Sequence, residues 1–417
     1  MPSAALKPPT TPQPDFAALA EQHGTPLFVY RKSVLKRQAD ALASAFPGCL
    51  PLYSMKCNPH PDLCRFFADR GFGMDTCSGQ ETLFAKSLGL APDHICYSAP
   101  GKTREDIEAC LGCCRLVADS WSELELIDAV CRDRGIQLEA GLRISPAIRF
   151  GAGLYPDILP AAPDKFGVPE EEIDDRAAWL ASLANVRVAH LHTYVRSQVL
   201  SAQALGACFA HAADIALHWH GLGLPLSSLN LGGGFGIPCR QEEPLDLAEV
   251  GRTVGQLKAR LSSNIPNLAV LIESGRFLAG EAGFFVSRIL DVKQSRGTTY
   301  AVCEGMLNHF LRPPLARLIS SLQKALSGGE PFPGPCEPLW SGPGTSLPFA
   351  VGKSCPAQRV TVCGSLCTVQ DTAAEDVELA NIAPGNLLVF PNAGAYAAAL
   401  SPHGFGFQKG CAEVLAD

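Results

Sequence analysis

The sequence has no excess of positive charge, no long apolar run and no segment with the layout of an export signal. Its 417 residues include 34 Lys and Arg against 41 Asp and Glu, a formal net charge of −7, so a basic surface for nucleic acid is not expected. The apolar runs are far shorter than the roughly 20 residues of a membrane-spanning helix. The start lacks a charged region followed by an apolar one. These absences predict a cytoplasmic protein that binds neither nucleic acid nor a membrane.

The 17 cysteines do not have the spacing of a disulfide framework or a zinc site. Their number is odd, they are scattered, and no export signal accompanies them, so reduced thiols are the simpler interpretation. The nearest approach to a metal motif is Cys110-x-x-Cys113-Cys114. It has no second pair at zinc-finger distance and falls within a helical pattern. We therefore expect neither disulfides nor a bound metal.

Residues 46–283 contain a regular alternation of strand and helix patterns. Short apolar runs predict strands at 49–53, 73–75, 94–98, 115–119, 138–144, 186–195, 227–231 and 268–272. Amphipathic stretches predict helices between them, at 62–69, 80–88, 104–111, 122–134, 170–183, 202–222 and 245–262. Eight strands alternating with helices are typical of a (β/α)8 barrel, although an open doubly wound sheet has the same local pattern.

The two ends of the sequence differ from this central part. Residues 1–15 contain five prolines and almost no large apolar side chains, which predicts a disordered tail. Residues 16–45 are predicted to hold a strand at 26–30 and a helix at 31–45. After residue 283 the alternation stops, and short strands are predicted at 284–294, 299–304, 357–362 and 386–390. Pro and Gly crowd residues 327–348, which predicts a long loop. We expect residues 284–417 to form a second, all-β domain.

Lys56 follows directly on the first apolar strand of the alternating region. A lysine at the end of a buried strand loses hydration, so its neutral amine becomes more accessible and can condense with an aldehyde to form a Schiff base. Taken alone, the same position is also compatible with a lysine whose aliphatic stem packs on the strand end while its charge stays in water. The meaning of Lys56 therefore depends on the residues that gather around it.

Polar residues or glycines follow most of the other predicted strands. In a barrel, the carboxyl ends of the strands converge on a single mouth, where we expect these side chains to meet: Asp75, Ser78, Ser98, Arg143, Tyr194, Ser197, Gly232 to Gly236, Glu273 and Arg276. The glycine run would let backbone N–H groups approach a phosphate. Glu273 would keep a pyridine nitrogen protonated, and Arg276 would clamp a phosphate. In isolation the glycine run could be an ordinary turn and the Glu-x-x-Arg pair a solvated ion pair.

These motifs, in this order, resemble the fold-type III pyridoxal-phosphate decarboxylases, which include diaminopimelate and ornithine decarboxylases and share their barrel with alanine racemase. The resemblance runs from about Thr25 onward and rests on 53–58, 74–81, 98–103, 231–235, 273–276, 311–313, 367–371 and 394–396. It implies a (β/α)8 barrel that binds pyridoxal 5'-phosphate and a C-terminal all-β domain that includes the N-terminal strand. It also implies a homodimer in which each active site is completed by the partner subunit.

The resemblance assigns a role to each matched residue. Lys56 corresponds to the Schiff-base lysine, Cys367 to the acid that reaches across the dimer and protonates the product, and Glu273 to the partner of the ring nitrogen. The remaining assignments are phosphate ligands, namely Ser197, Gly232, Gly233, Gly234, Arg276 and Tyr396; residues around the lysine and ring, namely Asp75, Glu81, Arg143 and Tyr194; and residues for the substrate, namely Arg312 and Asp371. The implied reaction is loss of the α-carboxylate of an amino acid.

Three positions depart from the family pattern. Tyr194 replaces a histidine that normally stacks on the ring and carries a proton, and Arg196 replaces a glycine beside the phosphate. Thr368 stands where enzymes for substrates with a distal amino group commonly have an acid, so a cationic tail would lose its counter-charge. With the stretch 304–313, this favours the biosynthetic branch of the family, whose members act on amino acids joined to a carrier protein or another metabolite. An amino-acid racemase and a catalytically silent homologue are the alternatives.

Overall fold

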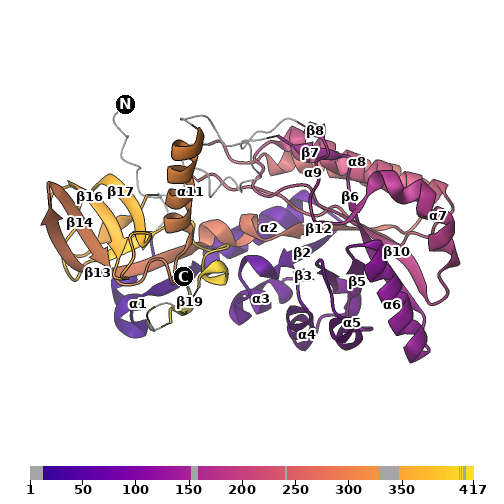
Figure 1. The fold of residues 1–417 in the computed structure, drawn as a ribbon, viewed down its shortest axis with the longest axis horizontal. Coiled ribbons are helices and arrows are strands. Elements are labelled where there is room, and N and C mark those ends of the chain that lie inside the picture. The colour runs from indigo at the N-terminus through magenta and orange to yellow at the C-terminus, as the bar shows by residue number, and fades with distance from the viewer. Residues whose placement is uncertain are drawn as a thin grey trace. The chain divides into compact units, whose positions relative to one another are not determined.

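The computed structural model describes residues 13–151, 158–239, 242–327, 347–402, 404, 406 and 410–417. These residues fall into two compact units. The barrel unit comprises the described residues of 38–238 and 243–277. The β unit comprises those up to residue 37, residues 239 and 242, and those from 278 onward. Figure 1 gives the order of the elements along the chain.

The barrel unit is built on eight parallel strands that close on themselves. They are β2 (Leu50–Ser54), β3 (Gly73–Thr76), β4 (Ile95–Ser98), β5 (Arg115–Ala118), β6 (Leu138–Ser145), β10 (Val186–Thr193), β11 (Ser228–Asn230) and β12 (Ala269–Ser274). Each pairs with the next in this order, and β12 pairs with β2 to close the ring. A short strand, β9 (Val168–Pro169), adds to β6, and β7 (Ile148–Phe150) pairs with β8 (Ile158–Pro160). The predicted (β/α)8 barrel is therefore confirmed.

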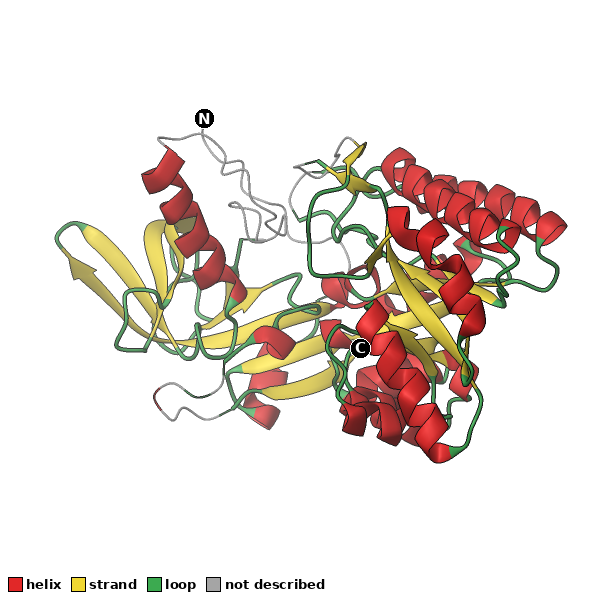
Figure 2. Ribbon diagram, turned by 45° about the vertical axis from the view of Figure 1, so that its right-hand side comes forward, coloured by secondary structure: helices red, strands yellow, loops and turns green. Residues whose placement is uncertain are grey.

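Helices precede, connect and follow the barrel strands and enclose them (Figure 2). They are α2 (Lys32–Ala45), α3 (Pro61–Ala68), α4 (Gly79–Ser87), α5 (Arg104–Cys110), α6 (Trp121–Arg134), α7 (Ile173–Ser182), α8 (Ala202–Gly221), α9 (Leu247–Asn264) and α10 (Arg276–Ala279). Several begin at a residue whose side chain accepts a hydrogen bond from the first turn, as Ser120 does from Glu123 at 3.1 Å. Among the described helices, none combines the length and the apolar character needed to cross a bilayer.

The β unit contains the strands at both ends of the chain. Its sheet has the order β15 (Phe349–Val351), β18 (Leu387–Phe390), β13 (Gly283–Ser295), β14 (Thr298–Cys303), β16 (Gln358–Gly364) and β17 (Thr372–Leu379). The N-terminal strand β1 (Leu27–Arg31) pairs with β13 and with the last strand, β19 (Ala412–Ala416). The all-β sheet that includes the N-terminal strand is thus confirmed. Helices α1 (Phe16–His23) and α11 (Arg312–Ser327) belong to the same unit.

Some elements of the β unit were not predicted from the sequence. Strand β17 has several exposed positions and carries acidic residues, so it lacks the apolar alternation of a typical strand. Helix α11 begins at Arg312 with two prolines in its first turn, where proline is tolerated because no helical N–H is required. Most of the predicted disordered tail lies outside the described residues, as do residues 328–346 of the predicted long loop.

A buried histidine at the amino ends of the barrel strands anchors that side of the barrel. The Nδ1 atom of His190 lies 2.9 Å from Oγ of Ser228, 3.1 Å from Oγ of Ser227 and 3.2 Å from Nη1 of Arg115. Burial, followed by the positive charges of Arg115 and Arg187, lowers the pKa of His190 to about 4. The imidazole is therefore neutral at pH 7 and accepts hydrogen bonds on Nδ1.

The depressed pKa of His190 predicts a loss of stability in acid. Between about pH 6.5 and about pH 4 the unfolded chain binds a proton at this histidine and the folded chain does not, so the free energy of unfolding falls with pH, by on the order of 3 kcal/mol from this group. In urea unfolding, the stability advantage of the native protein over His190→Gln should shrink across this range by that amount. Exposed His220 supplies the control, since His220→Gln should track the native protein. A constant difference for His190→Gln would contradict the assignment.

Candidate active site

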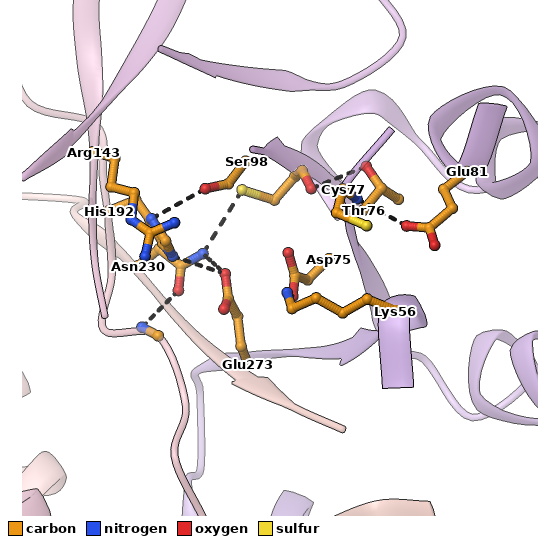
Figure 3. A network of polar contacts seen from close by, with 12 residues as sticks. Lys56, Asp75, Thr76, Cys77, Glu81, Ser98, Arg143, His192, Asn230 and Glu273 are labelled. Atoms are coloured by element: carbon orange, nitrogen blue, oxygen red, sulfur yellow. Dashed lines mark hydrogen bonds and ion pairs between the residues drawn. The ribbon is translucent and has the colours of Figure 1, made fainter. Parts of the chain in front are cut away.

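The carboxyl ends of the barrel strands bring together the residues that the sequence places after each strand. Strand pairing sets their neighbours. Asp75 on β3 is in register with Ser54 of β2, and Glu273 on β12 is in register with Leu52 of β2. Lys56 follows β2 in the short helix Met55–Cys57. Its strand therefore lies between the strands of the two carboxylates in the barrel. Figure 3 shows this network from close by.

Lys56 and Asp75 form an ion pair at this mouth. The Nζ atom of Lys56 contacts Oδ2 of Asp75. The Lys56 side chain is 40% exposed while the Asp75 side chain is 1% exposed, so the amine can be reached and the carboxylate cannot. Burial, together with the negative charge of Glu273, raises the pKa of Asp75 despite the ammonium beside it. The buried carboxylate therefore depends on Lys56 for its charge compensation.

A second polar network surrounds Glu273. Its Oε1 atom accepts a hydrogen bond from Nδ2 of Asn230 at 2.8 Å and lies 3.1 Å from Nε2 of His192, an ion-pair distance. Nδ1 of His192 lies 3.2 Å from Oγ of Ser98. Burial alone would raise the pKa of Glu273, but His192, Lys56 and Asn230 outweigh it and hold the pKa below its usual range. The site therefore contains a fully buried carboxylate in its charged form.

The glycine run after β11 forms a cradle in which only glycine fits. A Cβ on Gly232 would lie 2.3 Å from the carbonyl oxygen of Thr193, and Gly232 has a φ of +71°. A Cβ on Gly233 would lie 2.4 Å from the carbonyl oxygen of Glu273, and one on Gly234 would lie 2.5 Å from that of Arg196. The bare backbone thus packs against strands β10 and β12. We call residues 232–234 the glycine cradle.

Two arginine side chains lie near the ends of these strands. Nη2 of Arg276, at the start of α10, donates to Oγ of Ser197 at 3.4 Å. The Arg143 guanidinium lies over the rings of Phe166 and Tyr194, with its carbon 4.5 Å and 5.9 Å from the ring centres. Its Nη1 is 3.6 Å from Oδ1 of Asp119. Arg143 and Tyr194, which the sequence places in one cluster, therefore lie close together. Their contact with a cofactor stays a prediction.

Three of the residues named from the sequence have local roles that the sequence left open. Arg196 donates from Nη1 to the carbonyl oxygen of Gly151, so its guanidinium is bound to the segment after β7. Oε2 of Glu81 accepts from the backbone N–H of Cys77 at 2.8 Å, and Oγ of Ser78 accepts from that of Glu81 at 3.1 Å. Glu81 and Ser78 therefore fix the start of α4 behind the mouth.

The remaining predicted residues belong to the β unit, where two of them hold backbone segments. The buried Arg312 donates from Nη1 to the carbonyl oxygens of Asn392 and Ala395, at 3.2 and 3.0 Å, directly before Tyr396. Asp371 is 1% exposed, and its two oxygens accept from the N–H groups of Leu307 and Leu366, both at 2.8 Å. The substrate-binding roles of Arg312 and Asp371 stay predictions, since both side chains are engaged in these backbone contacts.

Cys367 and Tyr396 lie on the segments that these two residues hold. Cys367 follows Leu366 and is exposed. Tyr396 has a φ of +53°, a left-handed conformation that is uncommon for a non-glycine residue and is often found at functional sites. Gly394 comes two residues earlier, where a Cβ would lie 1.8 Å from the carbonyl oxygen of Ala279. The segment is therefore fixed tightly from both sides.

Sequence reasoning did not single out three residues of the Glu273 and Arg143 clusters. His192, Asn230 and Asp119 are all at least 95% buried. A signal existed for His192, because it lies two residues before Tyr194 and alternate residues of a strand point to the same face. Asn230 directly precedes Leu231 and the glycine cradle. Neither residue could be assigned a partner without knowing which strands are neighbours.

The glycine cradle gives a test of the site's construction that does not require any ligand. Gly233→Ala forces a Cβ against the carbonyl of Glu273, a backbone atom that cannot turn away, so we expect a loss of about 1–3 kcal/mol in the free energy of unfolding. The matched control is Gly255→Ala in α9, where a Cβ meets nothing within 4 Å. It should gain up to about 1 kcal/mol from helix propensity. Thermal unfolding of the two variants measures both effects, and equal shifts would contradict the tight cradle.

Comparisons with known proteins place the chain in a family. A model of the pyridoxal-binding domain of pyridoxal-dependent decarboxylases matches residues 32–280. L-glutamyl-(BtrI acyl-carrier protein) decarboxylase of Niallia circulans is 26% identical over 396 residues, which cover 94% of this chain and 88% of that protein. Diaminopimelate decarboxylase of Aquifex aeolicus is 25% identical over 406 residues, covering 96% and 88%.

Solved structures agree in fold. Diaminopimelate decarboxylase from Helicobacter pylori complexed with L-lysine superposes with a TM-score of 0.81 at 23% identity, covering 97% of this chain and 94% of that chain. Because the family model spans more than half of the sequence, the chain belongs to the pyridoxal-dependent decarboxylases, carboxy-lyases that use pyridoxal phosphate.

Proposed function

We propose that this protein removes the α-carboxylate of an amino acid or amino-acid conjugate, with pyridoxal phosphate held at the carboxyl ends of the barrel strands. The observation that carries the proposal is the glycine cradle, where the backbone leaves no room for a Cβ. A bare backbone beside Arg276 suits a phosphate group. A buried, charged carboxylate such as Glu273 suits the protonated nitrogen of a pyridine ring. The donor set of the mouth therefore fits the cofactor.

The proposed roles of the side chains at the barrel mouth follow from the groups that they contact. When bound, pyridoxal phosphate supplies an electron sink for the charge left by departing carbon dioxide. Lys56 is the proposed attachment residue, and Asp75 orients its amine and compensates its charge. Glu273 would accept a hydrogen bond from the ring nitrogen, and Arg143 and Tyr194 would be the residues beside the ring. The proposed phosphate ligands are Ser197, Gly232, Gly233, Gly234, Arg276 and Tyr396.

Cys367 is the proposed proton donor. Its side chain is exposed and its loop is held by the buried Asp371, so the thiol sits on a fixed segment with access from outside the β unit. In a homodimer with shared sites, the partner subunit's Cys367 would deliver a proton from Sγ to the α-carbon after loss of carbon dioxide. Arg312 and Asp371 are proposed to act on the substrate, Arg312 through its positive charge.

The proposed substrate is an amino acid joined to a carrier protein or to another metabolite. The residue after Cys367 is Thr368, whose hydroxyl contacts Oε1 of Gln370, so no carboxylate at this position would meet a distal ammonium. The Niallia circulans relative named above is called a decarboxylase of a glutamyl-carrier protein. A free diamino acid, as the names of the diaminopimelate decarboxylase relatives indicate for those proteins, is the second candidate substrate.

The proposed reaction can be tested by mass spectrometry in deuterated water. A panel of amino acids, free and carrier-linked, is incubated with pyridoxal phosphate and either the native protein or Lys56→Ala. We expect loss of carbon dioxide with gain of one deuterium at the α-carbon, strongest for a carrier-linked substrate and absent for Lys56→Ala. The control is Lys32→Ala, which removes an exposed lysine at the start of α2 and should react like the native protein.

Other outcomes of this experiment separate the alternatives. Gain of deuterium without loss of carbon dioxide would identify an amino-acid racemase and overturn the proposal. Decarboxylation of free diamino acids alone would retain the reaction and replace the proposed substrate class. Retention of the cofactor with no reaction on the whole panel would favour a catalytically silent homologue.

The proton-donor assignment has its own test. Cys367→Ala should lower kcat about 10²–10⁴-fold with the cofactor still bound, because a positioned acid is lost, whereas Cys355→Ala, at a half-buried cysteine of the same unit, should not. Mixing Lys56→Ala with Cys367→Ala should restore activity, since a mixed dimer with shared sites contains one intact site. Failure of the mixture to recover while each parent variant dimerises would argue against sharing.

A further inference from the structure

His192 places both ring nitrogens close to polar side chains in the middle of the barrel, with Nε2 at ion-pair distance from Glu273 but without a hydrogen bond in the present geometry. It lies on β10 and is 3% exposed. Its Nδ1 is 3.2 Å from the hydroxyl of Ser98, and its Nε2 is 3.1 Å from Oε1 of Glu273. A charged carboxylate can only accept, so two lone pairs at this distance would repel each other. Nε2 must therefore carry the hydrogen, whether the ring is neutral, with Ser98 donating to Nδ1, or positively charged.

Of the three side chains that favour the charged form of Glu273, His192 has the largest effect. The ammonium of Lys56 pairs with Asp75, and the Asn230 amide that donates to Glu273 is neutral. A buried carboxylate without an adequate donor is strongly destabilised and tends to take up a proton instead. A protonated Glu273 could no longer hold a proton on the ring nitrogen, because the carboxyl group would then offer a hydrogen of its own. His192 is the side chain that lies at ion-pair distance from this carboxylate.

Asn230 extends the network to the other end of the site. Its Nδ2 donates to Glu273 at 2.8 Å, while its Oδ1 accepts from the backbone N–H of Gly232 at 2.9 Å. One amide therefore fixes the carboxylate and the first residue of the glycine cradle in relation to each other. The contacts from Ser98 through His192 and Glu273 to Asn230 can be followed in Figure 3.

We propose that His192 is a positioning residue that acts through Glu273: its Nε2–H, at ion-pair distance from Oε1, keeps the carboxylate charged, so that Glu273 keeps the ring nitrogen of pyridoxal phosphate protonated. This inference rests on the proposed function, in which Glu273 meets the ring nitrogen. It gives His192 on β10 an effect on the protonation of the ring nitrogen that is separate from stacking by Tyr194. It also explains why a histidine occupies a fully buried position with no exposure to the mouth's entrance.

The test reads the protonation of the ring nitrogen and not the rate. Apoprotein of the native chain, His192→Leu and His192→Gln is loaded with pyridoxal phosphate labelled with ¹⁵N in the ring, and the ¹⁵N chemical shift and the dissociation constant are measured at neutral pH. We expect a protonated ring nitrogen in the native protein. In His192→Leu we expect a deprotonated ring nitrogen and cofactor binding weakened about tenfold to hundredfold. His192→Gln, whose amide can donate, should recover most of the ring protonation and most of the affinity.

The matched control is His190→Gln. His190 lies on the same strand two residues earlier and is also buried, but it contacts Ser227, Ser228 and Arg115 and not Glu273. A general effect of removing a buried histidine from β10 would alter both variants alike. The proposal requires that His190→Gln keep the ring-nitrogen signal of the native protein.

Two results would overturn the inference. One is a ring nitrogen in His192→Leu as protonated as in the native protein. The other, which does not depend on any variant folding, is a ¹⁵N spectrum of the native apoprotein in which the Nε2 of His192 carries no proton. Failure of the proposed function looks different, because the native protein would then take up no cofactor or hold it with an unprotonated ring nitrogen.

Discussion

Two carboxylates buried at the centre of one barrel mouth are the constraint on which the rest of the site depends. Asp75 and Glu273 are both at least 95% buried, and each raises the energy of the other's charge. Strand pairing places β3 and β12 on either side of β2, so Lys56 follows the strand between them. The ammonium of Lys56 forms an ion pair with Asp75, while His192 and Asn230 contact the carboxylate of Glu273. Removing any of these partners would leave a buried charge uncompensated.

The barrel separates stability from chemistry along the strand direction. At the amino ends, His190 is neutral and accepts hydrogen bonds from other side chains of the barrel. At the carboxyl ends, two residues further along the same strand, His192 faces a charged carboxylate. The same residue type thus serves as a hydrogen-bond acceptor at one end and lies at ion-pair distance from a carboxylate at the other. This division follows the general organisation of (β/α)8 barrels, in which the loops after the strands carry the reactive groups.

Much of the barrel could be predicted from the sequence because its strands are buried on both faces and read as short apolar runs separated by amphipathic helices. The position of Lys56, Glu273 and the glycine run after three such strands was enough to predict a common mouth. His192 was not identified, because its proposed role depends on its contact with Glu273, which is 81 residues away in the sequence. Strand β17 was missed because an exposed strand with acidic residues has no apolar pattern, and the order of the β sheet cannot be read from local sequence.

The proposal on which the site depends most directly is the attachment of pyridoxal phosphate to Lys56. Reduction of the loaded native protein with borohydride fixes a Schiff base as a stable secondary amine, and the labelled lysine can then be located by peptide mass spectrometry. We expect the added mass on the peptide that contains Lys56, in proportion to the cofactor bound. Label on another lysine, such as Lys86 or Lys102, with Lys56 unmodified would contradict it.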